Sequence, residues 1–261
     1  MRQHSHGFTL IELLVVITII VVLLALLTPA ADKAIRLAEQ ARCAANLHAL
    51  GLANSYYRQD NRKKFPTASG ISGPVFNVIY SGPGNDAVSS YATWGGKMGT
   101  EYTYPIRLIN PYVGIQRAVS VGDDEGVFRV FRCPSDDGTS PAPGSAFSSN
   151  RKPTTFDCWG SSYFYNSTGN NNDASGLWNK TDVRSPSRCV NVNDWSFNSW
   201  FIRPQNTPGV PFDYTFWHSL TEGELGWGNV LLVDSHVDFL QAMPDEPDHQ
   251  TGPGYTFLPD R

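Results

Sequence analysis

The feature that most constrains this chain is an uninterrupted apolar run of twenty residues, at positions 8–27. Its only polar members are Thr9, Glu12 and Thr18. Twenty helical residues span roughly 30 Å, which is the thickness of a bilayer's hydrocarbon core. A helix that is apolar on every side over this length is typical of a membrane span. Helix-forming residues follow the run and no small-residue cleavage site does, which argues against a secretory signal peptide.

Glu12 is a carboxylate inside this run and has no cation near it in sequence. Placing a carboxylate in an apolar span costs roughly 3 kcal/mol on insertion scales, so it requires a partner or a function. Residues 8–27 contain no Lys, Arg or His. The partner must therefore come from another molecule or from a chain terminus created by cleavage. A cut between Gly7 and Phe8 would leave an amine on Phe8, four residues before Glu12 and on the same helix face.

The string GFTLIE at residues 7–12 resembles the cleavage and methylation motif of type IV pilins and type II secretion pseudopilins. In that family a prepilin peptidase cuts after the glycine on the cytoplasmic side, and the new N-terminal Phe is N-methylated. The resemblance implies processing at Gly7 and Phe8. It also implies assembly through Phe8 and Glu12, with the carboxylate neutralising the amine of an adjacent subunit. Pro29 stands where many family members carry a helix-loosening proline.

The remaining sequence divides into a helical stem and a turn-rich head. Of the 18 prolines only Pro29 precedes residue 66. Residues 31–64 carry seven Lys or Arg and three acidic residues, whereas residues 65–261 carry twelve Lys or Arg and twenty acidic residues. We expect one long helix that is apolar all round, then amphipathic, and ends near residues 61–66. The resemblance implies an α+β fold, the pilin-like lollipop, in which this helix packs on a loop-rich antiparallel β-sheet head. The expected domains are a leader at 1–7, a transmembrane or filament-core segment at 8–28, an amphipathic segment at 29–62 and a head at 63–261.

Patterns within the stem and head predict further local elements. Helical spacing predicts an inward stripe of Cys43, Leu47 and Leu50. Apolar and β-branched runs predict strands at residues 127–133, 161–165, 188–192, 229–233 and 236–240, with a short helix at 104–110. Asp234 and Ser235 predict a two-residue hairpin turn between the last two strands.

Several head strings, such as FRCPSD at 131–136 and NVLLVDSHV at 229–237, resemble one branch of the pilin-like proteins. That branch has a C-terminal prepilin-processing-associated segment, in which a His precedes an Asp-Gly pair at a hairpin tip. Here the pair is Asp234 and Ser235, and His218 lies about sixteen residues upstream.

Candidate metal ligands concentrate on the predicted C-terminal hairpin. Asp234, His236 and Asp238 alternate, so they would share one face of it. Because His and carboxylate suit a divalent transition metal, His218, Asp234 and His236 are candidate ligands. The alternative is a polar solvent face with an Asp that hydrogen-bonds its own turn.

Calcium is a second candidate cofactor, since pseudopilin heads resembling this one often hold Ca²⁺ in an oxygen-rich loop. Such loops occur at residues 122–126, 136–138 and 170–173, and none has EF-hand spacing. A charged, solvated turn is the alternative at each of the three.

The four cysteines are Cys43, Cys133, Cys158 and Cys189. Disulfides persist outside the cytoplasmic membrane, and four cysteines allow three full pairings. We favour Cys158 with Cys189 because both flank predicted head strands, whereas Cys43 equally suits a small buried apolar residue. None has C-x-x-C spacing, which argues against zinc and thioredoxin-like sites.

Seven tryptophans add a large aromatic content, with Trp195, Trp200, Trp217 and Trp227 late in the chain. Exposed, they would suggest carbohydrate binding; we expect them to form the core of the head. The chain has no G-x-S-x-G, H-E-x-x-H or phosphate-binding glycine loop, so we expect no enzyme and name no catalytic residue. The net charge of −4 argues against a nucleic-acid partner.

Together these observations predict a pilin or pseudopilin, a structural subunit of a type IV pilus-like or type II secretion filament. The expected partners are a prepilin peptidase, copies of itself or other pilins, an inner-membrane assembly platform, and the lipid bilayer before assembly. The expected location is the inner membrane, crossed once, with the head in the periplasm or outside. One alternative is a surface or filament-tip carbohydrate-binding module, and another is a membrane-anchored metal enzyme using His218, Asp234 and His236.

Overall fold

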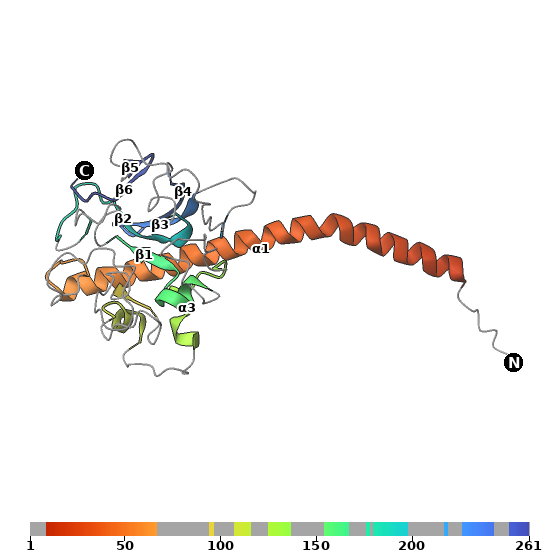
Figure 1. Cartoon of the computed structure of the whole chain (residues 1–261), viewed down its shortest axis with the longest axis horizontal. Helices are drawn as coiled ribbons and strands as arrows, with labels where there is room; N and C mark the ends of the chain where they lie inside the picture. Colours follow the sequence, from red (N-terminus) through yellow and green to blue (C-terminus); the bar gives the residue numbers. More distant parts are fainter. Residues whose placement is uncertain are drawn as a thin grey trace, which may run out of the picture. The chain divides into compact units, whose positions relative to one another are not determined.

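The computed structural model describes residues 9–66, 94–96, 107–115, 125–136, 154–166, 176–177, 180–197, 217–218, 226–242 and 251–260. It has two compact units, Met1–Ala38 and Glu39–Arg261, and each is described by itself. The helices are α1 (Leu10–Asp60) and α3 (Thr155–Trp159), with 3₁₀ helices η1 (Asn110–Val113) and η2 (Glu125–Phe131) (Figure 1). The strands are β1 (Tyr163–Tyr165), β2 (Val190–Asp194), β3 (Trp227–Leu232), β4 (Val237–Gln241), β5 (Thr251–Gly252) and β6 (Tyr255–Thr256).

A four-stranded antiparallel sheet, in the order β1-β2-β3-β4, forms the centre of the second unit. Its strands lie where four of the five predicted strands were expected, with β2 shifted by two residues toward the C-terminus. The long N-terminal helix and this sheet confirm the predicted α+β class. A register shift between Val190 and Val192 interrupts the pairing of β2 with β3.

Residues 39–60 of α1 pack one face against the sheet. The predicted inward stripe is confirmed, because Cys43, Leu47 and Leu50 are each fully buried. At Gly51 the helix approaches β3 so closely that a Cβ atom there would lie 2.8 Å from Leu231 Cδ1. A side chain at this position would force the end of the buried Leu231 side chain to shift, which favours glycine here although it is a poor helix former.

The helix ends at Asp60, close to the predicted boundary. The Lys63 N–H donates to the Arg58 carbonyl at 2.7 Å, and Arg62 is left-handed with φ of 55°. This is the Schellman arrangement that closes many helices, formed here without the usual glycine.

The predicted strand at residues 127–133 is wrong, because most of it forms the 3₁₀ helix η2. Residues three apart share a face in a 3₁₀ helix. Phe128 and Phe131 have this spacing and are both buried, whereas Val127 is 46 % exposed. The Asn46 side chain on α1 donates to the Arg132 carbonyl at 3.0 Å, just after η2. Of the short helix predicted at 104–110, residues 104–106 lie outside the described residues and residues 107–109 are not helical. A 3₁₀ helix starts instead at Asn110, with Pro111 in its first turn.

The β3–β4 hairpin has a three-residue loop and not the predicted two-residue turn. The Ser235 N–H donates to the Leu232 carbonyl at 3.0 Å, and the Leu232 N–H donates to the His236 carbonyl at 2.9 Å. Ser235 is left-handed, with φ of 77°. These are the features of a turn followed by a bulge whose left-handed position usually carries glycine.

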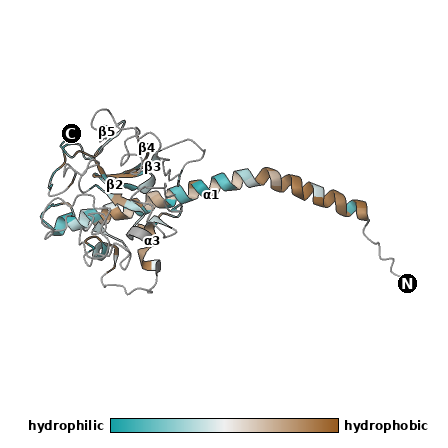
Figure 2. Cartoon of the chain, viewed as in Figure 1, coloured by the Kyte–Doolittle hydropathy of each residue, from teal (hydrophilic) through white to brown (hydrophobic). Residues whose placement is uncertain are grey.

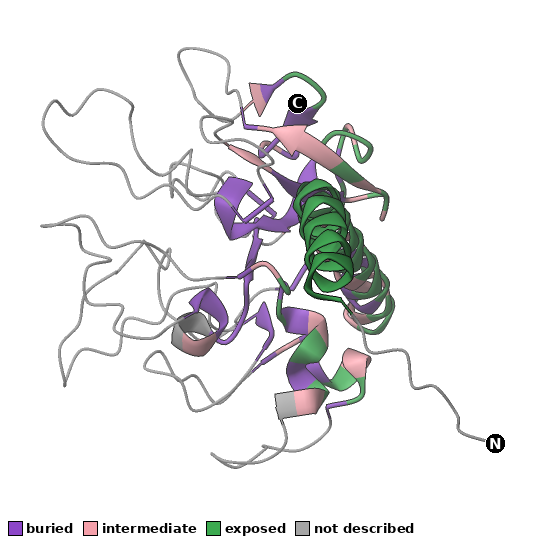
Figure 3. Cartoon of the chain, turned by 90° about the vertical axis from the view of Figure 1, so that its right-hand side faces the viewer, coloured by how far each residue is buried: buried purple, intermediate pink, exposed green. Residues whose placement is uncertain are grey.

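Aromatic rings fill the core between residues 39–60 of α1, the sheet and the neighbouring segments. Figure 3 marks the buried residues of this unit in purple. Trp94 stacks on Tyr165 with ring centroids 5.6 Å apart, and its indole N–H donates to Asn54 Oδ1 on α1 at 3.1 Å. Buried tryptophans usually have such a partner for their one donor. The head is therefore held together by aromatic packing and by polar anchors from the helix.

Candidate functional site

The part of α1 in the first unit presents its apolar side chains on all sides. Its large hydrophobic side chains at positions 10–27 are between 46 % and 80 % exposed. Figure 2 shows the ribbon of this stretch coloured almost continuously as hydrophobic. By length and composition α1 can cross a membrane. Apolar surface of this extent requires a cover of lipid or of other helices.

Glu12 lies in the first turn of α1 and hydrogen-bonds with Thr9. The Thr9 N–H and hydroxyl donate to Glu12 Oε2 at 2.8 and 2.7 Å, and the Glu12 N–H approaches the Thr9 hydroxyl oxygen at 3.3 Å. This reciprocal pattern is a capping box, which starts a helix by satisfying its first backbone donors. It gives Glu12 hydrogen bonds but no positive charge. The predicted processing residues Gly7 and Phe8 lie outside the described residues.

The structure does not bring the three predicted metal ligands together. His236 lies at the exposed hairpin, with Nδ1 2.6 Å from Asp234 Oδ1 and Nε2 3.3 Å from Asp238 Oδ2. The three alternating residues therefore meet as expected, and Asp234 also accepts the His236 N–H at 3.3 Å, as a turn Asp commonly does. Among the described residues, the side chains close enough to share an ion are Cys43, Cys133 and His218.

His218 is instead completely buried beside groups that sequence reasoning missed. Its Nε2 lies 3.0 Å from Asp194 Oδ2, and both side chains are 0 % exposed. The same nitrogen lies 3.4 Å from Cys133 Sγ. Asp194 Oδ2 also accepts the Asn229 backbone and side-chain N–H groups at 2.7 and 3.0 Å. Spacing along the chain carries no signal for this cluster, because its members come from separate segments.

The disulfide of the head joins Cys43 on α1 to Cys133 after η2. The predicted Cys158–Cys189 pair is wrong, because Cys189 is a free and fully buried thiol. Burial raises the pKa of Cys189 to about 12, so the thiol is inert at neutral pH. The side chain of Cys158 lies outside the described residues. The inward position predicted for Cys43 was the one available signal for the true pair.

The structure describes only a small part of the three candidate calcium loops. The loop at 170–173 and most of the other two lie outside the described residues. Asp136 is buried, and its carboxylate accepts the Thr155 and Phe156 N–H groups at 2.9 and 2.8 Å and the Ser162 hydroxyl at 2.5 Å. This carboxylate therefore anchors the start of α3 to the residue that precedes β1.

The described tryptophans of the late cluster are mainly core residues. Trp195 and Trp217 are 3 % and 4 % exposed, and the partly buried Trp227 stacks on Phe239 with centroids 5.4 Å apart. Trp200 lies outside the described residues. The expectation that these rings form the core is confirmed for Trp195 and Trp217.

Comparison with known proteins places the N-terminal segment. Residues 2–28 match the family model described as the prokaryotic N-terminal methylation motif. Comparison with curated proteins and with solved structures gives no match. The matched segment contains Gly7, Phe8 and Glu12 and continues into the exposed apolar helix. The chain thus carries the prokaryotic N-terminal methylation motif on a long apolar helix, a combination that fits a type IV pilin or pseudopilin.

Proposed function

We propose that the chain is a structural subunit of a type IV pilus-like or type II secretion filament, made as a precursor and cut between Gly7 and Phe8. The observation that carries this proposal is the methylation motif at residues 2–28, which covers a helical run with exposed apolar side chains and, at positions 8–27, a single carboxylate. A prepilin peptidase makes the cut, and the new amine on Phe8 is N-methylated. The protein acts by assembly and not by catalysis.

The exposed apolar helix needs a different cover at each stage. Before assembly the lipid bilayer surrounds residues 8–28 as a single span of the inner membrane. In the filament, helices of other copies or other pilins replace the lipid. Helix association in such a setting is driven by close packing and by polar contacts. An inner-membrane assembly platform moves the subunit between the two, with residues 63–261 on the periplasmic or outer side.

Glu12 supplies the polar contact. Its hydrogen bonds to Thr9 fill acceptor positions but leave the carboxylate charge uncompensated. The amine on Phe8 of a neighbouring subunit compensates this charge in a setting where an isolated carboxylate costs roughly 3 kcal/mol. A subunit without the carboxylate inserts into the bilayer more readily, yet it lacks the contact that sets its register in the filament.

The test is Glu12→Ala, with Thr18→Ala as the matched control. Thr18 is the other strongly polar position deep in the run, and its hydroxyl donates to the Val15 carbonyl of its own helix at 2.8 Å. Glu12→Ala is expected to insert and to be processed, but not to assemble. Thr18→Ala is expected to do all three. Normal filaments from Glu12→Ala, scored by electron microscopy and by the sheared fraction, would contradict the proposal.

The described tryptophans of the late cluster give no support to a carbohydrate-binding head. Two of them are buried, and the third is partly buried against Phe239. The alternative of a metal enzyme using His218, Asp234 and His236 gains no support either, since His218 lies in a different, fully buried cluster. We therefore propose no second function for the chain.

A further inference from the structure

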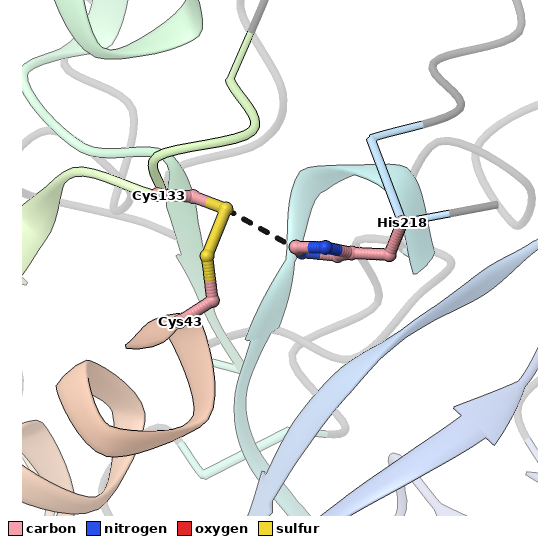
Figure 4. A group of neighbouring side chains, drawn as sticks. All are labelled: Cys43, Cys133 and His218. Carbon is pink, nitrogen blue, oxygen red and sulfur yellow. Dashed lines mark hydrogen bonds between the residues drawn. A yellow bond between two sulfur atoms is a disulfide. The ribbon is translucent and has the colours of Figure 1, made fainter. Parts of the chain in front are cut away.

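The disulfide and His218 form a buried cluster that filament assembly does not use. Figure 4 shows the ring of His218 directed at the sulfur of Cys133, with Cys43 on the other side of the disulfide. Cys43 and Cys133 are both 0 % exposed, and their Cα atoms are 5.2 Å apart. The donor atoms of the three residues all lie within 4.8 Å of one another. All three belong to the Glu39–Arg261 unit.

We propose that this cluster is a redox-controlled metal site, in which reduced Cys43 and Cys133 bind Zn²⁺ together with His218. A dithiol reductant opens the disulfide by exchange. The reductant gives its two electrons to the protein sulfurs and leaves as its own cyclic disulfide, and its two thiol protons pass, through solvent, one to each protein sulfur. Zn²⁺ then replaces these two thiol protons, which pass to solvent. Thiolate and neutral imidazole are the ligands that zinc prefers in proteins.

The spacing of the donor atoms fits a tetrahedral ion. Zinc–sulfur and zinc–nitrogen bonds of about 2.3 and 2.0 Å place neighbouring ligand atoms roughly 3.3–3.8 Å apart. His218 Nε2 is already 3.4 Å from Cys133 Sγ. The one large change is the separation of the two sulfurs from a covalent bond to about 3.8 Å. The segments that carry Cys43 and Cys133 do not have to move together to bind the ion, because the disulfide already holds the two cysteines side by side.

Asp194 supplies the remaining polar contact. Its Oδ2 lies 3.0 Å from His218 Nε2, close to one edge of such a tetrahedron. Asn229 donates to this oxygen twice and holds it in place. Asp194 Oδ1 has no hydrogen-bond partner among the described residues, and neither does His218 Nδ1. Polar atoms buried without a partner are costly, and such atoms often mark a site that a ligand completes. Asp194 is therefore the candidate fourth ligand.

Metal and disulfide would perform the same structural task in alternative ways. The disulfide joins two segments separated by 90 residues. The metal would join these two and also His218, which lies 85 residues beyond Cys133. Bound Zn²⁺ would also occupy both thiolates and so slow their reoxidation, since free thiolate is the reacting species.

The experiment uses the full chain in detergent, reduced with a dithiol that is then removed without oxygen. We expect one Zn²⁺ per reduced chain and no tight binding to the oxidised chain. With Co²⁺ as the probe, the reduced chain should develop thiolate-to-metal charge-transfer absorption. Cys133→Ser should abolish both signals, and His218→Gln should weaken the affinity at least tenfold. Cys189→Ser, which removes a buried thiol outside the cluster, should bind like the wild type.

A second measurement keeps the proposal falsifiable if a variant fails to fold. In the wild type, Zn²⁺ should slow the return of the Cys43–Cys133 disulfide on exposure to oxidant, as read by peptide mass mapping. A reduced, folded wild type that binds no Zn²⁺ would overturn the proposal. So would reoxidation at the same rate with and without Zn²⁺, or undiminished binding by folded Cys133→Ser.

Discussion

Removing the disulfide should cost the head a large part of its stability. The Cys43–Cys133 bond closes a loop with a sequence separation of 90 residues. In the chain-entropy account, cross-linking a loop of this length removes unfolded-state freedom that corresponds to about 4.6 kcal/mol at 25 °C. For a head of this size, 1 kcal/mol shifts the Tm by about 2–4 °C, so the expected fall is roughly 9–18 °C.

The perturbation is the double variant Cys43→Ala/Cys133→Ala, compared with Cys189→Ala. Cys189 is equally buried but free, so its replacement reports the loss of one buried sulfur without the loss of a cross-link. Urea and thermal unfolding of the full chain in detergent, followed by tryptophan fluorescence, give the free energy of unfolding of the double variant and of the control. We expect the double variant to lose at least about 2 kcal/mol more than the control. A difference below about 1 kcal/mol would refute the idea that this bond constrains the unfolded chain.

Three further predictions concern single positions in the head. Gly51→Ala places a Cβ 2.8 Å from buried Leu231, so the overpacking cost of about 1–3 kcal/mol should exceed the gain in helix propensity of about 1 kcal/mol. Ala45→Gly, at an exposed position of the same helix, measures that propensity difference by itself. A Gly51→Ala variant more stable than the wild type would contradict this. Ser235→Gly should stabilise by about 0.5–1 kcal/mol in urea unfolding, because Ser235 has φ of 77°, and an unchanged midpoint would count against the hairpin geometry. Burial raises the pKa of Cys189 to about 12, so the protonated thiol contributes stability that is complete below about pH 9. This stability is lost between pH 9 and about 12 because the unfolded thiol deprotonates first, and the loss at pH 10 is roughly 1 kcal/mol. Equal losses in the wild type and in Cys189→Ala would contradict this.

The parts of the fold that could be predicted are those with long or regular patterns. The twenty-residue apolar run allows few structures other than a helix, and the stripe of Cys43, Leu47 and Leu50 repeats at helical spacing over two turns. The C-terminal strands have continuous apolar runs next to a turn signal. In contrast, the 127–133 segment combines alternation with a three-residue repeat, and only packing of Phe128 and Phe131 decides between strand and 3₁₀ helix.

The candidate sites likewise divide into one that could be predicted from local sequence and one that could not. Glu12 is informative from sequence alone because its neighbours are all apolar, so its cost and its need for a partner follow from local composition. The cluster of Cys133, Asp194 and His218 depends on contacts between segments far apart in the chain. No spacing rule indicates such contacts, which is why the predicted cysteine pair was wrong and Asp194 was missed.

The most direct test of the central claim is the intact mass of the chain isolated from its own membranes. A processed subunit should lack residues 1–7, begin at Phe8, and carry one added methyl group on its new amine. Gly7→Ala, which changes only the residue before the cut, should retain the full leader and lack the methyl group. A wild-type chain that keeps residues 1–7, in cells whose prepilin peptidase processes other substrates, would contradict the account.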